Sequence, residues 1–180
     1  MKYLRNISAA VIAAAVSKAY AFEQLTIQEN GLNKTVYIVG NTDYEPKGGD
    51  RIVMEHNTGY QLTRSDYYGP DNFYGVNLLG GSIEYDVDLS QSGCSCNAAF
   101  TLVYLPAKDE KGNPSAGPFG TYYCDANNIN NQWCPEFDIM EANTYAWRTT
   151  PHKCDPPNSN DHFYNCDRQG SCIQEAWTKL

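Results

Sequence analysis

The chain has 180 residues, with 21 Asp and Glu against 13 Lys and Arg, which gives a formal net charge of −8 at pH 7. A chain this acidic is repelled by nucleic acid and by anionic membrane surfaces, so we expect neither as a partner. A neutral polymer such as a polysaccharide suits its charge better. The length fits a single domain, and we expect a monomer.

The first 21 residues have the order of a secretory signal peptide. Lys2 and Arg5 precede a short apolar run, and a small-x-small triplet at 19–21 offers a cleavage site. The apolar run is too short to span a bilayer as a helix. We therefore predict a secreted protein whose mature domain is 22–180. The signal holds three of the basic residues and no acid, so the mature chain carries a net charge of −11.

The residue pattern of the mature chain predicts strands joined by loops. Short β-branched runs lie at 35–39 and 50–54, and residues 82–90 alternate strictly between apolar and polar side chains. The apolar stretch 97–107 suits a strand that is buried on both faces. Turns rich in Gly, Pro and Asn separate these runs, and no segment keeps a 3.6-residue apolar period. The pattern predicts an all-β sandwich or barrel.

Cysteine usage agrees with secretion. In an oxidising compartment, seven cysteines predict up to three disulfides with one thiol left over, whose connectivity the sequence does not reveal. Their spacing does not match a structural zinc site, and we expect neither a metal nor a cofactor. The cysteines all lie in the second half of the mature chain: Cys94, Cys96, Cys124, Cys134, Cys154, Cys166 and Cys172.

Two rows of acidic residues are candidates for a site. In the first row, Glu84, Asp86 and Asp88 share one face of the predicted strand 82–90, whose other face is apolar. A half-buried strand that shows its polar side to water explains this row.

The second row lies in the stretch CPEFDIMEAN and is set among bulky apolar neighbours. On a strand, Glu136 and Asp138 share a face and Glu141 is one residue out of phase. A β-bulge near Ile139 and Met140 would return Glu141 to that face, and bulges are frequent beside active sites. Acids held close together among apolar groups have raised pKa values, which suits acid–base chemistry. The row is either a surface strand or a catalytic one.

The segment around the second row resembles a known family. EFDIMEANTYAWRTTPHKCD (136–155) is similar to the Glu-x-Asp-x-x-Glu-Ala-Asn strand of glycoside hydrolase family seven, the cellobiohydrolases and β-1,4-endoglucanases. LLGGSIEYDVDLSQSGCSCNAAFTLVYLPA and GTYYCDAN resemble segments that precede that strand in the family, in the same order. A shorter acid row also marks the family-sixteen β-glucanases of the same clan.

The resemblance implies a fold and a mechanism. The fold is a concanavalin-like β-jelly roll of two curved antiparallel sheets, here cross-linked by disulfides. The mechanism is retaining hydrolysis of a β-linked glucan such as cellulose, with Glu136 as nucleophile, Glu141 as acid/base and Asp138 between them. His152, Trp147 and Asn143 would contact substrate or support the site. A short-looped cleft would favour internal cleavage, as in an endo-β-glucanase.

Family-seven enzymes are much longer, so we expect a compact relative, a lectin-like derivative or a truncated chain whose sandwich is incomplete at the C-terminus. Two alternatives to a hydrolase remain open. One is a non-catalytic carbohydrate-binding or wall-associated protein on the same fold. A structural disulfide-rich domain whose acids bind calcium or face water is the third class of protein. Calcium takes six or more oxygen ligands, and these cannot be counted in the sequence.

Overall fold

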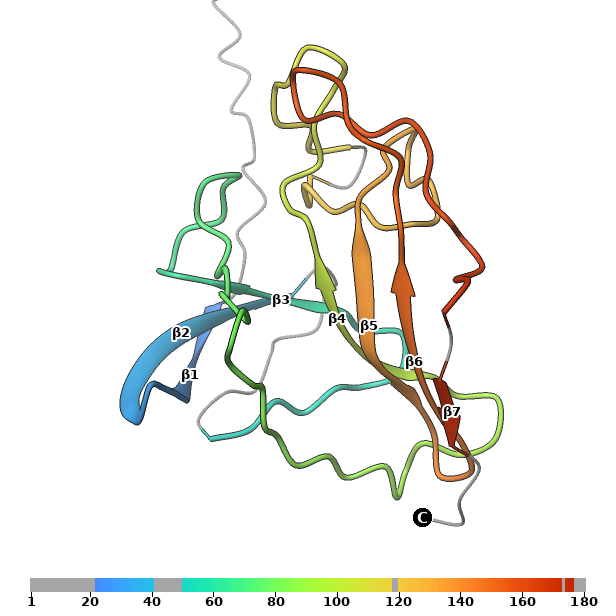
Figure 1. The fold of residues 1–180 in the computed structure, drawn as a ribbon. Coiled ribbons are helices and arrows are strands. Elements are labelled where there is room, and N and C mark those ends of the chain that lie inside the picture. The colour runs from blue at the N-terminus through green and yellow to red at the C-terminus, as the bar shows by residue number, and fades with distance from the viewer. Residues whose placement is uncertain (1–21, 41–49, 118–119, 173, 177–180) are drawn as a thin grey trace, which may run out of the picture.

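The computed structural model describes residues 22–40, 50–117, 120–172 and 174–176. Across these residues the chain forms strands and loops, arranged as two antiparallel sheets with strand orders β1-β2-β3 and β4-β5-β6-β7 (Figure 1). The predicted fold class, all-β with two antiparallel sheets and disulfides, is confirmed. Over the same residues, no helix is long and apolar enough to cross a membrane. The expected signal peptide, 1–21, lies outside the described residues.

The smaller sheet is a hairpin extended by one short strand. Asn30 and Gly31 join its first two strands with φ angles of 53° and 77°, the left-handed conformation that a two-residue hairpin turn requires. The side chains of Leu25, Val36 and Ile38 form its buried core. The β-branched run predicted at 35–39 lies inside the second strand. The strands are β1 (Phe22–Glu29), β2 (Leu32–Gly40) and β3 (Tyr60–Thr63).

The larger sheet carries the second acid row on its second strand. The pairing with the neighbouring strand joins Phe100 to Met140 and then Thr101 to Asp138, so Ile139 is an extra residue. The pairing on the other side shifts between Asp138 and Glu141 as well. The predicted β-bulge is therefore confirmed. The strands are β4 (Ala98–Val103), β5 (Glu136–Ala142), β6 (Trp147–His152) and β7 (Gln174–Ala176).

Three strand predictions need correction. Residues 82–90 form no strand: Tyr85 and Val87 are 36% and 42% exposed, and Leu89 is the one buried apolar side chain of the row. The segment contacts the larger sheet through side chains, as in the edge-on packing of Tyr85 on Phe100, and without a main-chain partner the alternation cannot make a ladder. Residues 50–54 contribute a single bridge residue. Of 97–107, only the β4 part is a strand, and its side chains are mostly half-buried rather than buried on both faces.

The cysteines divide between two disulfides and three thiols. Cys124 pairs with Cys134 and Cys154 with Cys166. Cys94, Cys96 and Cys172 are free and exposed. Up to three disulfides and one thiol left over were expected, so the prediction of a single thiol is wrong: the described residues hold two disulfides and three thiols. Both disulfides close loops at one end of the larger sheet.

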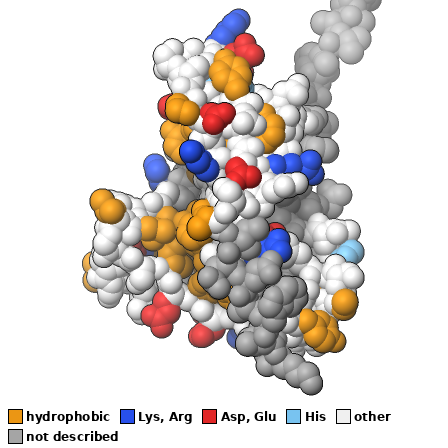
Figure 2. All heavy atoms as spheres, turned by 45° about the vertical axis from the view of Figure 1, so that its right-hand side comes forward, with side chains coloured by type: hydrophobic (Ala, Val, Ile, Leu, Met, Phe, Trp, Pro, Cys, Tyr) orange, Lys and Arg blue, Asp and Glu red, His pale blue; other side chains and the backbone are white. Residues whose placement is uncertain are grey.

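The buried apolar side chains form separate clusters. One lies on the smaller sheet, one joins Leu89 to Met140 and Ala142, and one surrounds the disulfide Cys124–Cys134. On the face shown in Figure 2, exposed apolar side chains lie between Lys, Arg, Asp and Glu. The described residues therefore bury their apolar side chains in several small clusters.

Candidate active site

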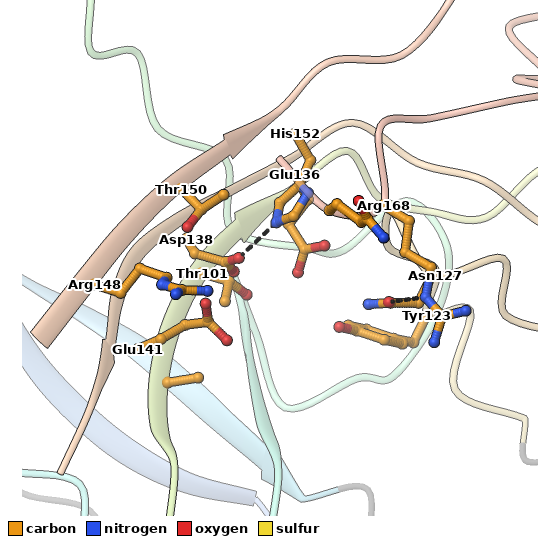
Figure 3. A pocket seen from close by; sticks show the side chains of 12 residues that line it. Thr101, Tyr123, Asn127, Glu136, Asp138, Glu141, Arg148, Thr150, His152 and Arg168 are labelled. Atoms are coloured by element: carbon orange, nitrogen blue, oxygen red, sulfur yellow. Dashed lines mark hydrogen bonds and ion pairs between the residues drawn. The ribbon is translucent and has the colours of Figure 1, made fainter. Parts of the chain in front are cut away.

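An open groove of about 540 Å³ runs over one face of β4, β5 and β6. All three acids of the second row point into it, with Glu136 and Glu141 on either side of Asp138 (Figure 3). The twelve residues that line the groove come from these strands and from segments in or beside two disulfide-closed loops: Ala99, Thr101, Tyr123, Asn127, Glu136, Asp138, Glu141, Arg148, Thr150, His152, Arg168 and Gln169.

The three acids differ in their depth. Glu136 and Asp138 are 8% and 5% exposed, whereas Glu141 is half-buried at the rim. The Asn97 amide donates to Glu141 Oε1 at 3.1 Å and holds that carboxylate from the β4 side. The bulge at Ile139 is what places Glu141 on the same face as the other two. The Thr149 hydroxyl donates to the carbonyl of Ile139, the residue that the bulge leaves without a partner on β4.

The first disulfide loop delivers a hydrogen-bond donor to Glu136. Cys134 lies two residues before Glu136, and its bond to Cys124 folds the intervening loop back over the start of β5. The backbone N–H of Ala126 then donates to Glu136 Oε2 at 3.0 Å. A buried carboxylate that accepts such a bond is stabilised in its ionised form.

The second disulfide loop fixes His152 in the same way. Cys154 lies two residues after His152, and its bond to Cys166 brings the Asp167 carbonyl to the ring. His152 Nδ1–H donates to that carbonyl at 2.7 Å, which leaves Nε2 at 3.0 Å from Asp138 Oδ2. The ring thereby links the second loop to the acid row.

The pKa values of the deep groups follow from this burial. Loss of hydration raises the pKa of Glu136 to about 7, although the Ala126 N–H opposes the shift. Burial, with the charge of Glu141, raises the pKa of Asp138. Burial lowers the pKa of His152, but its bonds to Asp167 and Asp138 outweigh this and the net shift is upward. Near neutral pH these groups therefore share protons, as an acid–base site requires.

Two predicted site residues lie outside this groove. Trp147 packs against the cluster of Leu89, Met140 and Ala142. Asn143 shapes the β5–β6 turn, where its side chain accepts from the N–H groups of Tyr145 and Ala146. Both line a second depression of about 280 Å³ that shares Glu141 and Arg148 with the groove. They could contact only a ligand that extends past Glu141.

Several groove residues escaped the sequence reasoning. Arg148 and Thr150 share a face of β6 with His152, so counting back in twos from His152 would have found them. Tyr123 stands beside Cys124 in the segment GTYYCDAN, and its hydroxyl donates to Asp125 at 2.9 Å. Arg168 and Gln169 follow directly after the second disulfide loop and have no signal in the sequence.

One atom each of Glu136, Asp138 and His152 lie close enough together to hold a metal ion.

An open groove whose carboxyl groups project from one strand face is the type of site that glycosidases use. No protein-family profile matches the chain. Curated relatives do match: the endo-β-1,4-glucanase celB of Aspergillus oryzae is 31% identical over 115 residues, 56% of this chain and 27% of the relative. Endoglucanase 1 of Pyricularia oryzae is 34% identical over 110 residues, covering 51% and 24%.

Endoglucanase EG-1 of Trichoderma longibrachiatum is 31% identical over 151 residues, which cover 67% of this chain and 32% of the relative. The chain is a relative of the endoglucanases of glycoside hydrolase family seven, at modest identity, and it spans a quarter to a third of the length of the relatives it matches. A solved structure of glycosynthase variants of Cel7B from Humicola insolens aligns with 88% of this chain and 59% of that one, at 17% identity and a TM-score of 0.45.

Proposed function

We propose that the chain is a secreted hydrolase of β-linked glucan that uses the acid row in a retaining mechanism. The observation that carries the proposal is that a bulged strand turns three carboxyl groups into one open groove. The endoglucanase names of its relatives support a glucan as substrate. The groove is open along the sheet, which favours cleavage inside a polymer over cleavage at its end.

The roles of the acids follow from their depth and partners. Glu136, deep and held by the Ala126 N–H, attacks the anomeric carbon and forms a glycosyl-enzyme. Glu141, at the rim, protonates the leaving oxygen and later removes a proton from the attacking water. Asp138 lies between them and, with His152, holds the proton that would otherwise neutralise Glu136.

The pH dependence has a defined sign. Attack needs ionised Glu136, and its pKa of about 7 means that turnover falls as the pH drops below that value. The positive charge of protonated His152 favours the ionised carboxylate, so replacing His152 by Gln should move this acid limb to higher pH.

The test is a screen of the secreted chain on cellulose, mixed-linkage glucan, laminarin and xyloglucan, with Glu136→Gln and Glu141→Gln variants. Glu136→Gln should lose nearly all turnover while staying folded, and Glu141→Gln should lose about 10²–10⁴-fold. Glu84→Gln, in the exposed row, is the matched control and should keep full activity. The anomeric configuration of the first product, followed by NMR, tests retention.

Two outcomes would contradict the proposal. Equal turnover in wild type and Glu136→Gln would show that the acid row takes no part in the reaction. Glycan binding without turnover in the wild type would favour a non-catalytic carbohydrate-binding protein.

A further inference from the structure

A nitrogen and two carboxylates converge at the deep end of the groove. One ligand atom from each of Glu136, Asp138 and His152 lies within 4.8 Å of the others. The side chains of His152 and Asp138 are 9% and 8% exposed. We infer that these three residues form a binding site for a divalent transition-metal ion such as Zn²⁺, a property that goes beyond glucan hydrolysis.

The histidine is oriented as a metal ligand must be. Its Nδ1–H donates to the Asp167 carbonyl at 2.7 Å, so Nε2 faces the carboxylates. Metal-binding histidines almost always donate their other N–H to a carbonyl or carboxylate, which fixes the ring and makes the ligand nitrogen more basic. Here Asp167, directly after the Cys154–Cys166 loop, provides that partner without using either carboxylate.

A buried hydroxyl beside these residues independently indicates a missing ligand. Thr150 pairs with Asp138 across β5 and β6, lines the same groove and is 2% exposed. Its Oγ1 has no hydrogen-bond partner, and Figure 3 shows it beside Asp138. A buried hydroxyl without a partner is costly. A metal ion, or water bound to that ion, would satisfy it.

The donor set selects the kind of metal. One imidazole nitrogen and two carboxylate oxygens suit zinc or manganese, whereas calcium prefers six to eight oxygens. Bonds of about 2.0–2.1 Å to zinc place ligand atoms about 3.3 Å apart. His152 Nε2 and Asp138 Oδ2, at 3.0 Å, are close to that spacing, and the ligand atom of Glu136 lies within 4.8 Å of both.

Some of the surrounding charges favour a bound cation and others oppose it. Glu141 adds a third negative charge to the groove. Arg148 and Arg168 line the same groove on opposite sides and oppose a cation (Figure 3). A metal ion displaces the proton shared by His152 and Asp138. It also occupies Glu136, so a metal and a reacting glycan exclude each other.

The test is calorimetric titration of ZnCl₂ into the full secreted chain without substrate. The three exposed thiols are first alkylated, because thiolates also bind zinc. We expect one zinc ion per chain. His152→Ala should weaken binding by about 100-fold or more and Thr150→Val by about tenfold. His56→Ala, which removes an exposed histidine outside the groove, is the matched control and should bind as wild type does.

Asp138→Asn keeps the shape of the side chain and guards against a variant that fails to fold. Zinc affinity in folded Asp138→Asn or His152→Ala equal to that of wild type would overturn the inference, and so would the lack of a one-to-one complex. Calcium chloride should bind at least about 100-fold more weakly, given its preference for oxygen ligands. Because no substrate is present, zinc binding by a chain that hydrolyses no glucan would contradict the proposed function alone.

Discussion

The two acid rows have similar sequence patterns but differ in how far the protein buries them. In the first row, Glu84, Asp86 and Asp88 are exposed, on a segment that belongs to no sheet. Asp88 accepts a bond from the Ser90 N–H at 2.9 Å, and this lowers its pKa. These carboxylates stay exposed to water.

The second row is held between β4 and β6 and covered by two disulfide loops. There the loss of water raises the pKa of Glu136 to about 7. Alternating acids thus do not by themselves make a site. Pairing on both sides of the strand, and loops that exclude water, turn carboxylates into groups that share protons.

The largest expected difference between the rows is catalytic. Asp138→Asn should lower kcat by about 10²–10³-fold, because it removes the group that holds a proton between Glu136 and His152. Asp86→Asn, the same change in the exposed row, should leave kcat unchanged. Initial rates across pH 4–9 measure both, and the acid limb should move in Asp138→Asn alone. Similar kcat values for the two variants would contradict the distinction.

The second expected difference is in pH-dependent stability. The pKa of Glu136 rises from an ordinary value near 4.5 to about 7, so the folded chain binds this proton more tightly than the unfolded chain. Its contribution is fully present below about pH 4.5 and is lost as the pH rises through about 7. At pH 8, Glu136→Gln should raise the free energy of unfolding by about 2 kcal/mol, and near pH 4.5 by little.

Urea unfolding at both pH values measures this effect. Glu84→Gln, in the hydrated row, should show no such pH-dependent gain. A Glu136→Gln variant that is less stable than wild type at pH 8 would contradict the burial argument.

A third comparison tests the loop that covers the second row. Gly170 and Gly80 have φ angles of 72° and 76°, so alanine strains both. An added Cβ at Gly170 would also collide with the methyl group of Thr150, whereas nothing lies near Gly80. Gly170→Ala should therefore be about 1–2 kcal/mol more destabilising than Gly80→Ala. Its acid limb should also move to lower pH, as water reaches Glu136. Equal thermal unfolding would show that the loop is not packed on β6.

The smallest expected effect concerns the bulge. Thr149→Val removes the hydroxyl that donates to the Ile139 carbonyl, at a cost of about 1 kcal/mol, and should lower kcat through a less well-placed Glu141. Thr149→Ser keeps the hydroxyl and should retain most of both properties. Chemical unfolding and kcat of the pair measure this effect. If the valine variant is as active and as stable as the serine variant, the strand pairing alone maintains the bulge.

The sequence predicted the bulge because side chains on a strand alternate with period two. Glu141 is out of phase with Glu136 and Asp138, and one extra residue is the simplest way to bring three polar groups to one face. The sequence also contains a hairpin signal, Asn30-Gly31 between alternating segments, from which the turn between β1 and β2 could have been predicted. Local geometry of this kind depends only on neighbours in the chain.

The strand predicted at 82–90 is wrong for the opposite reason. Its alternation is as regular as that of many strands, but a strand exists only where another supplies main-chain partners. Arg168 could not be placed in the groove from sequence for a similar reason, since it lies there only because the Cys154–Cys166 disulfide positions the segment that follows it. Which cysteines pair is a question of distance in space, and the sequence left it open.

By itself, the sequence determined the all-β class, the acidic charge and the row of acids with its bulge, because composition and period are local properties of the chain. The tertiary structure alone decided which of two acid rows loses its water. Burial depends on strands and loops distant in sequence, and the pKa of a carboxyl group follows from its burial.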